Sequence, residues 1–188
     1  MKTLALHAID QIDHLVQPEE FQEITLSSSA LDIFTDFKKH RPLMIDNQTL
    51  AIDAEREMLR SHVKMKLVVD NQKELVGLIS YEDIVSQNVV KLVANGFQRD
   101  ELTVDDLMTP RDSIKALNYS DVEHASIANL VDTLKQNGVQ HCLVVDPARH
   151  HIRGLISASD IARKLKLSIS VVKAPSFADI FRAIKSDF

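Results

Sequence analysis

Short apolar runs bounded by polar turns alternate along most of the chain with segments of helical spacing. The runs at 67–69 and 75–79 are short and rich in β-branched residues, which is typical of buried strands. A polar turn joins them, as in a hairpin. Further strands are predicted at 43–45 and 114–117, each in front of a helical segment.

Two amphipathic helices are predicted between these strands. The first is expected to run from a cap at Thr49 to about residue 60, and the second from Asp121 to about residue 137, with Gly138 as its C-cap. Apolar residues recur at helical spacing in both, and these predict the buried stripes Ala51, Ala54, Met58 and Leu59 in the first and Ile127, Leu130, Val131 and Leu134 in the second.

The chain contains an internal repeat. Leu-Val-Val-Asp at 67–70 returns at 143–146, Gly-Leu-Ile-Ser at 77–80 returns at 154–157, and Asp-Ile at 83–84 returns at 160–161. The second copy follows the first by 76 residues before the turn and by 77 after it. One α/β unit is therefore written twice, and each copy is too small to bury a good core alone, so the copies should pack together.

The motif in both copies is a glycine, two apolar residues, a serine, two further residues and an aspartate, at 77–83 and 154–160. With the valine-rich strands that end in Asp70 and Asp146, it resembles the CBS domain, which usually occurs as a tandem pair called a Bateman module. The resemblance covers roughly residues 30 to 165, and the segment 107–110 is similar to the family's lead-in to a unit. Leu67 and Leu143 stand where the family usually has proline, and residues 34–40 match the lead-in poorly.

The resemblance implies an α/β fold of two β-α-β-β-α units, packed about an approximate two-fold axis. We expect an N-terminal segment at 1–28, the first unit at 29–95, the second at 96–170 and a C-terminal helix at 171–188. Because members of the family commonly pair, the helices at 84–93 and 161–167 are expected at the interface of a homodimer.

The family also implies a ligand. In members of the family, the motif aspartate accepts hydrogen bonds from ribose hydroxyls and the motif serine contacts ribose or phosphate, in a cleft between the units. We therefore expect a non-enzymatic, cytoplasmic sensor that binds an adenosine-containing ligand, with AMP, ADP and ATP as the first candidates, and acts in trans on an unidentified protein partner. Seven candidate ligand-binding residues follow from the motif and its neighbours: Ser80, Asp83, Thr109, His141, Ser157, Asp160 and Arg163.

The motif has a second interpretation. Ser-x-x-Asp at a helix start is also a capping box, which needs no ligand, and both interpretations can hold at once. The motif glycine permits close approach of a ligand, yet it also suits close packing of the two units. The alternative function is a ligand-free adaptor that docks a partner through its terminal helices.

The two copies differ after the motif. Arg163 and Lys164 follow the second motif, whereas Glu82 precedes Asp83 in the first. His141 replaces Met65 on the equivalent strand and adds a hydrogen-bond donor. The sequence therefore predicts that the two sites are unequal, with the second preferring phosphorylated ligands.

The composition excludes several other classes of protein. An apolar content of 45% suits a globular core, and a net charge of −5 disfavours nucleic acid. No run approaches the roughly 20 apolar residues of a membrane helix. The single cysteine, Cys142, excludes an internal disulfide and fits a reducing compartment. Neither structural zinc spacing nor a catalytic motif stands out, so we expect no metal and no enzyme.

Both ends lie outside the repeat. A helix is predicted over residues 9–16, ending near Pro18. Near the other end, Pro175 breaks the chain, Ser176 is expected to cap a helix, and an apolar stripe follows at Phe177, Ile180, Phe181 and Ile184. This last helix is expected to pack on its own module, across a dimer, or against a partner protein.

Overall fold

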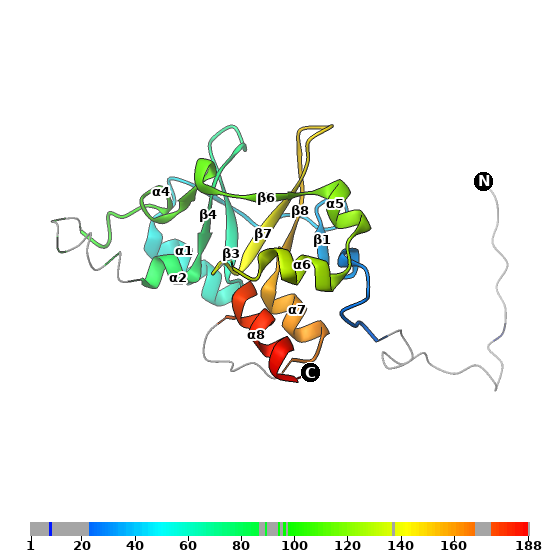
Figure 1. Cartoon of the computed structure of the whole chain (residues 1–188). Helices are drawn as coiled ribbons and strands as arrows, with labels where there is room; N and C mark the ends of the chain where they lie inside the picture. The colour runs from blue at the N-terminus through cyan, green and yellow to red at the C-terminus, as the bar shows by residue number, and fades with distance from the viewer. Residues whose placement is uncertain are drawn as a thin grey trace.

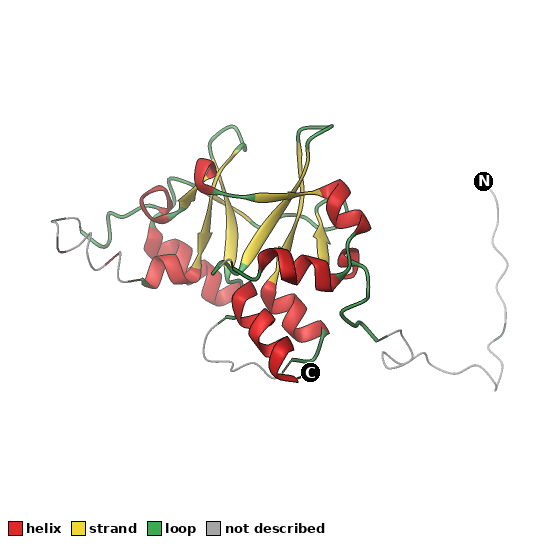
Figure 2. Cartoon of the chain, viewed as in Figure 1, coloured by secondary structure: helices red, strands yellow, loops and turns green. Residues whose placement is uncertain are grey.

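A computed structural model describes residues 8, 23–86, 89, 94, 96, 98–136, 138–167 and 174–187. These residues form two four-stranded sheets, and the two hairpin turns lie together at one end of the module, with most of the longer helices toward the other (Figures 1 and 2). Apolar residues of both sheets meet between them, among them Met65, Leu67 and Leu143. The two copies therefore pack against each other, as expected.

The two sheets have the same topology. The first has the order β2 (Met44–Asp46), β3 (Met65–Val69), β4 (Leu75–Ser80) and β5 (Thr109–Pro110). The second has the order β6 (Ala116–Asn118), β7 (His141–Asp146), β8 (His151–Ser157) and β1 (Phe34–Asp36). In each sheet the first pair is parallel and the other two pairs are antiparallel.

Helices complete the β-α-β-β-α order in both units. The first unit contains α1 (Ala51–Ser61) and α2 (Tyr81–Val85), and the second contains α5 (Tyr119–His124), α6 (Ile127–Leu134) and α7 (Ala158–Lys164). Short turns of helix form η2 (Ala30–Ile33), α4 (Val104–Leu107) and η3 (Arg111–Ser113), and α8 (Phe177–Asp187) follows the repeat.

Each unit receives its edge strand from the first segment of the other unit. Strand β1 lies at the start of the first unit but pairs with β8, and β5 lies near the start of the second unit but pairs with β4. Thr35 lies opposite Leu155, and Thr109 lies opposite Leu78, so the two exchanged strands occupy equivalent positions in register. Residues 34–36 therefore act as the first lead-in strand despite their poor match in sequence.

The motif glycines permit this exchange. A Cβ added to Gly77 would lie 2.7 Å from the carbonyl oxygen of Thr109, which is closer than real Cβ atoms come to backbone. A Cβ on Gly154 would overlap the carbonyl oxygen of Thr35 and the ring of Phe34. Of the two roles left open by the sequence, close packing of the exchanged strand is the one these contacts support.

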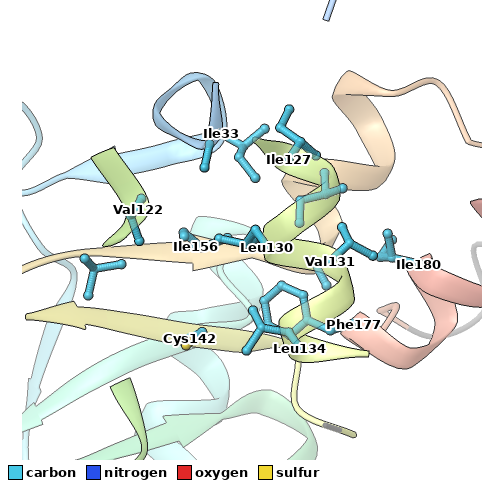
Figure 3. Close-up of a cluster of buried hydrophobic side chains, with 14 residues drawn as sticks. Ile33, Val122, Ile127, Leu130, Val131, Leu134, Cys142, Ile156, Phe177 and Ile180 are labelled. Atoms are coloured by element: carbon cyan, nitrogen blue, oxygen red, sulfur yellow. The ribbon is translucent and has the colours of Figure 1, made fainter. Parts of the chain in front are cut away.

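Each unit has its own apolar core, and the exchanged segments contribute to both. Leu102 and Val104, from the start of the second unit, are buried in the first core. Ile33 of η2 is buried in the second core, where Phe177 and Ile180 of α8 join it (Figure 3). The predicted C-terminal helix and its apolar stripe are therefore confirmed, and α8 packs on its own module beside α6 and α7.

Both predicted helices differ in part from their predictions. Helix α1 begins at Ala51 after Leu50 as its N-cap, so Thr49 is not the cap, and Leu59 is 50% exposed and lies outside the buried stripe. The single helix expected at 121–137 is two helices, because Ser126 forms a capping box with Asn129 that starts α6.

The end of α6 also differs from the prediction. The helix stops at Leu134 with Lys135 as its C-cap, so Gly138 is not the cap. The stripe of Ile127, Leu130, Val131 and Leu134 is buried as predicted. The expected helix at 9–16 and much of the expected continuation of α2 toward residue 93 lie outside the described residues.

Candidate functional site

A cavity with a volume of about 820 Å³ lies between the two units, and it is larger than the second cavity described below. This volume falls within the roughly 300–1,000 Å³ typical of small-molecule sites. Met65 of β3 and four longer segments line it: the end of β4 with the start of α2, the stretch from β5 to β6, the end of α6 with the start of β7, and residues 174–179. Ser80, Asp83, Thr109 and His141, four of the predicted site residues, are among the lining residues.

Ser80 and Asp83 form a capping box at the start of α2. The Ser80 hydroxyl accepts a hydrogen bond from the Asp83 N–H at 3.2 Å, and Asp83 Oδ2 accepts from the Ser80 N–H at 2.8 Å and from its hydroxyl at 2.6 Å. The capping interpretation is therefore confirmed for the first motif. Because Oδ2 accepts both of these hydrogen bonds, the cap does not use Oδ1 of Asp83.

The second motif has a different local geometry. The Ser157 side chain makes no capping hydrogen bond, and Asp160 instead pairs with Arg163 at 2.6 Å. Asp160, Arg163 and Lys164 line a separate cavity of about 250 Å³, smaller than a typical ligand site. Ser157 is not among the residues that line either cavity.

His141 lies at the start of β7, opposite Ser157 in the sheet. Burial lowers the pKa of His141 to about 4, although the nearby charge of Asp160 acts in the opposite direction. The imidazole is therefore uncharged at neutral pH and presents one donor and one acceptor to its surroundings. Thr109 lies on the exchanged strand β5, so the strand exchange brings it to the same cavity as Asp83.

The sequence analysis missed the contribution of the C-terminal segment to the larger cavity. Ala174, Ser176 and Asp179 line it, and the Gln140 side chain ties this segment to the first motif. Gln140 Nε2 donates to Glu82 Oε1 at 2.9 Å and to the Ala174 carbonyl oxygen at 3.0 Å.

Ser176 and Asp179 cap α8 as Ser80 and Asp83 cap α2. Asp179 Oδ2 accepts from the Ser176 N–H at 2.9 Å and from its hydroxyl at 2.7 Å. These hydrogen bonds, with a contribution from Arg182, lower the pKa of Asp179 to about 2. A sequence signal was present, because Ser176 and Asp179 have the same Ser-x-x-Asp spacing as the two motifs.

No three His, Cys, Asp or Glu side chains of the described residues are grouped so that they could hold a metal ion. Among those same residues, no helix is both long and apolar enough to span a membrane.

Comparison with protein families gives one match, to the CBS domain, at residues 33–88 and 104–167. A comparison with curated proteins finds no match. These two segments coincide with the two structural units and include both Ser-x-x-Asp motifs.

Several solved structures share the fold. An uncharacterized conserved protein from Pyrococcus horikoshii matches with a TM-score of 0.57 and 16% identity, over 79% of this chain and 100% of that one. CBSX2 from Arabidopsis thaliana, in complex with AMP, matches with a TM-score of 0.52 and 21% identity, over 72% and 94%. The CBS domain pair of protein MJ0100, in complex with 5′-methylthioadenosine and S-adenosyl-L-methionine, matches with a TM-score of 0.51 and 20% identity, over 74% and 94%.

Proposed function

The chain belongs to the CBS domain family, and from that premise we propose that it is a regulatory module that binds an adenosine-containing ligand in the larger cavity. Proteins built of CBS pairs are generally regulatory, and no catalytic family matches this chain. The observation that carries the proposal is that the first motif opens on a cavity of about 820 Å³ whose opposite wall comes from the second unit.

The chemistry of the lining suits a nucleoside. Oδ1 of Asp83 is not used by the cap, and a carboxylate oxygen is a good acceptor for ribose hydroxyls. Leu78, Ile114 and Leu117 offer apolar surface on which an adenine ring can lie. Structures of CBSX2 with AMP and of MJ0100 with 5′-methylthioadenosine and S-adenosyl-L-methionine show that modules of this fold hold adenosine compounds.

A ligand in this cavity would contact both units and residues 174–179 at once. Its binding would therefore favour one arrangement of these three parts over others, which is how a ligand changes a population of conformations. We propose that this change is passed in trans to a protein partner in the cytoplasm.

We also propose that the module forms a homodimer. On α1 and α2, Ile52, Leu59 and Val85 are 40%, 50% and 46% exposed, although all three are large and apolar. Contiguous apolar patches on a surface are typical of protein interfaces, and we propose that these three residues belong to one. Sedimentation at micromolar concentration would test this, because a monomer there contradicts the proposal.

The alternative function, a ligand-free adaptor, is favoured by one observation: Asp83 already caps α2 without any ligand. Calorimetry and thermal unfolding with AMP, ADP, ATP, S-adenosylmethionine and NAD test the two functions against each other. If the first holds, at least one adenosine compound binds the natural protein and raises its unfolding temperature.

An Asp83→Ala variant shows where the ligand binds, and Asp106→Ala provides a matched control. Asp106 caps α4 with the same two hydrogen bonds from Thr103 but lines neither cavity. Both variants should lose about 1 kcal/mol of stability with the cap. Only Asp83→Ala should also weaken ligand binding, by about 1.5–3 kcal/mol. If Asp83→Ala loses stability yet binds as tightly as Asp106→Ala, the aspartate is only a cap.

A further inference from the structure

The larger cavity continues beyond the part of it that the two motifs and β6 define. One of its walls, residues 114–117, lies beside β7, because Ala116 pairs with Leu143. Residues 138–140 also line the cavity, and they precede the first residue of β7. The cavity therefore extends past the start of β7, away from the wall on which we place the adenine ring.

Residues 138–140 and Ala174 form one wall of this extension, the C-terminal wall. The Phe177 N–H donates to the Val139 carbonyl oxygen at 3.1 Å, and Gln140 Nε2 donates to the Ala174 carbonyl oxygen at 3.0 Å. These two hydrogen bonds hold the start of the C-terminal helix against the segment that leads into β7. Part of the wall therefore comes from outside the two segments that match the CBS domain.

The C-terminal wall carries an exposed apolar side chain. Val139 is 51% exposed although it lines the cavity. Leu134 and Ala174, which are also apolar, line the cavity as well. Covering apolar surface that is otherwise in water is favourable in proportion to the area covered. This part of the cavity therefore suits an apolar group of a ligand.

A nucleoside held by Asp83 would direct its 5′ carbon toward the C-terminal wall. The two ribose hydroxyls that a carboxylate can accept from lie on one edge of the sugar ring. The base and the 5′ carbon leave the ring on opposite sides, so a base on residues 114–117 leaves the 5′ carbon pointing past the start of β7. A nucleoside is smaller than the drug-sized ligands that fill sites of roughly 300–1,000 Å³, so by itself it leaves part of the 820 Å³ unfilled.

From this arrangement we infer that the cavity holds an adenosine compound with an apolar 5′ substituent of several carbon atoms, and that Val139 of the C-terminal wall contacts this substituent. The inference rests on the proposed adenosine function and narrows its ligand. Asp83 binds the sugar, residues 114–117 bind the base, and the C-terminal wall determines which 5′ substituent the cavity prefers.

Three uncharged compounds test the inference: adenosine, 5′-methylthioadenosine and 5′-butylthio-5′-deoxyadenosine, in which the apolar 5′ group becomes longer. Calorimetric titration of the natural protein should give affinities that rise in that order, with at least about tenfold between adenosine and the butylthio compound. The reason is that each methylene buried against the wall raises the affinity by up to about fourfold.

Val139→Ser removes apolar surface from the wall and keeps the main-chain hydrogen bond to Phe177. It should lower the affinity for the butylthio compound relative to adenosine by about threefold to tenfold. Val85→Ser is the matched control. Val85 is 46% exposed, close to the 51% of Val139, but it lines neither cavity, so the same ratio should stay at the value of the natural protein.

The outcomes separate the inference from the function on which it rests. If the butylthio compound binds no more tightly than adenosine, or if Val139→Ser and Val85→Ser give the same ratio, the inference is wrong and the adenosine function stands. A butylthio compound that binds Asp83→Ala as tightly as the natural protein lies at another site, which also contradicts the inference. If none of the three compounds binds while AMP, ADP or ATP does, only the inference fails. If no adenosine compound binds at all, the proposed function fails and the inference fails with it.

Discussion

Replacing Gly154 by alanine tests the strand exchange on which both cores depend. Gly154 lies on β8 opposite Asp36 of β1, and a Cβ there would overlap the Thr35 carbonyl oxygen and the Phe34 ring. The carbonyl belongs to a paired strand, and the Phe34 ring packs on Tyr119 with their centroids 5.8 Å apart, so neither can move freely. Overpacking of this kind destabilises a protein by about 1–3 kcal/mol, and we expect the upper part of that range.

Urea unfolding measures this loss. With a slope of about 2 kcal/mol per molar, a loss of 2–3 kcal/mol lowers the midpoint by roughly 1 M. Gly138→Ala is the matched control, because no atom lies within 4 Å of the Cβ that it would add. Its free energy of unfolding should differ from that of the natural protein by no more than about 0.5 kcal/mol. The loss of stability caused by Gly77→Ala should lie between the losses caused by Gly138→Ala and Gly154→Ala, since the flexible Met108 side chain can move aside while the Thr109 carbonyl oxygen cannot.

A midpoint for Gly154→Ala equal to that of Gly138→Ala would refute the reasoning. Equal midpoints would mean that β1 does not pack on β8 as closely as the structure shows. The ligand alternative for this glycine would also give a distinct result, in which stability is retained and only ligand affinity falls.

Changing the buried Arg153 to Met should lower the unfolding free energy by about 3 kcal/mol, because it removes the cation that pairs with the carboxylate of Asp36, whose side chain is only 13% exposed, and adding Asp36→Leu should restore most of that loss in urea unfolding. Burial lowers the pKa of His141 from 6.5 to about 4, so the unfolded chain binds that proton more readily. Stability should therefore fall as the pH drops from about 6.5 to about 4, by up to about 1.4 kcal/mol per pH unit, and His141→Gln should flatten this part of the profile. If the second motif prefers phosphorylated ligands, Asp160→Ala should weaken AMP more than adenosine in calorimetry; a variant that binds AMP normally, beside an Asp83→Ala variant that does not, would contradict this order.

The sequence by itself determined the features that depend on nearest neighbours along the chain. Both copies of Leu-Val-Val form strands at the predicted places, within β3 and β7, because short β-branched runs between polar turns suit a buried strand in any context. Ser176 caps α8 and Phe177 and Ile180 are buried, since a cap and a helical stripe are local signals. The Ser-x-x-Asp spacing likewise predicts the capping box that Ser80 and Asp83 form at the start of α2.

The tertiary structure alone decided what lies across from these residues. Strands β1 and β5 have three and two residues, too few to show a period of two, so the sequence could not reveal that each pairs with the other unit. That pairing explains why Gly77 and Gly154 need to be glycine.

The same limit applies to the cavity. Asp83 and Asp179 are 96 residues apart in the chain, and they meet at one cavity only because α8 packs on the second core while Gln140 spans from Glu82 to Ala174. The two motifs are nearly identical in sequence, yet Ser80 caps its helix and Ser157 does not, and only the first opens on the larger cavity. Local sequence specifies a helix start, whereas the volume and charge in front of it depend on which distant segments pack there.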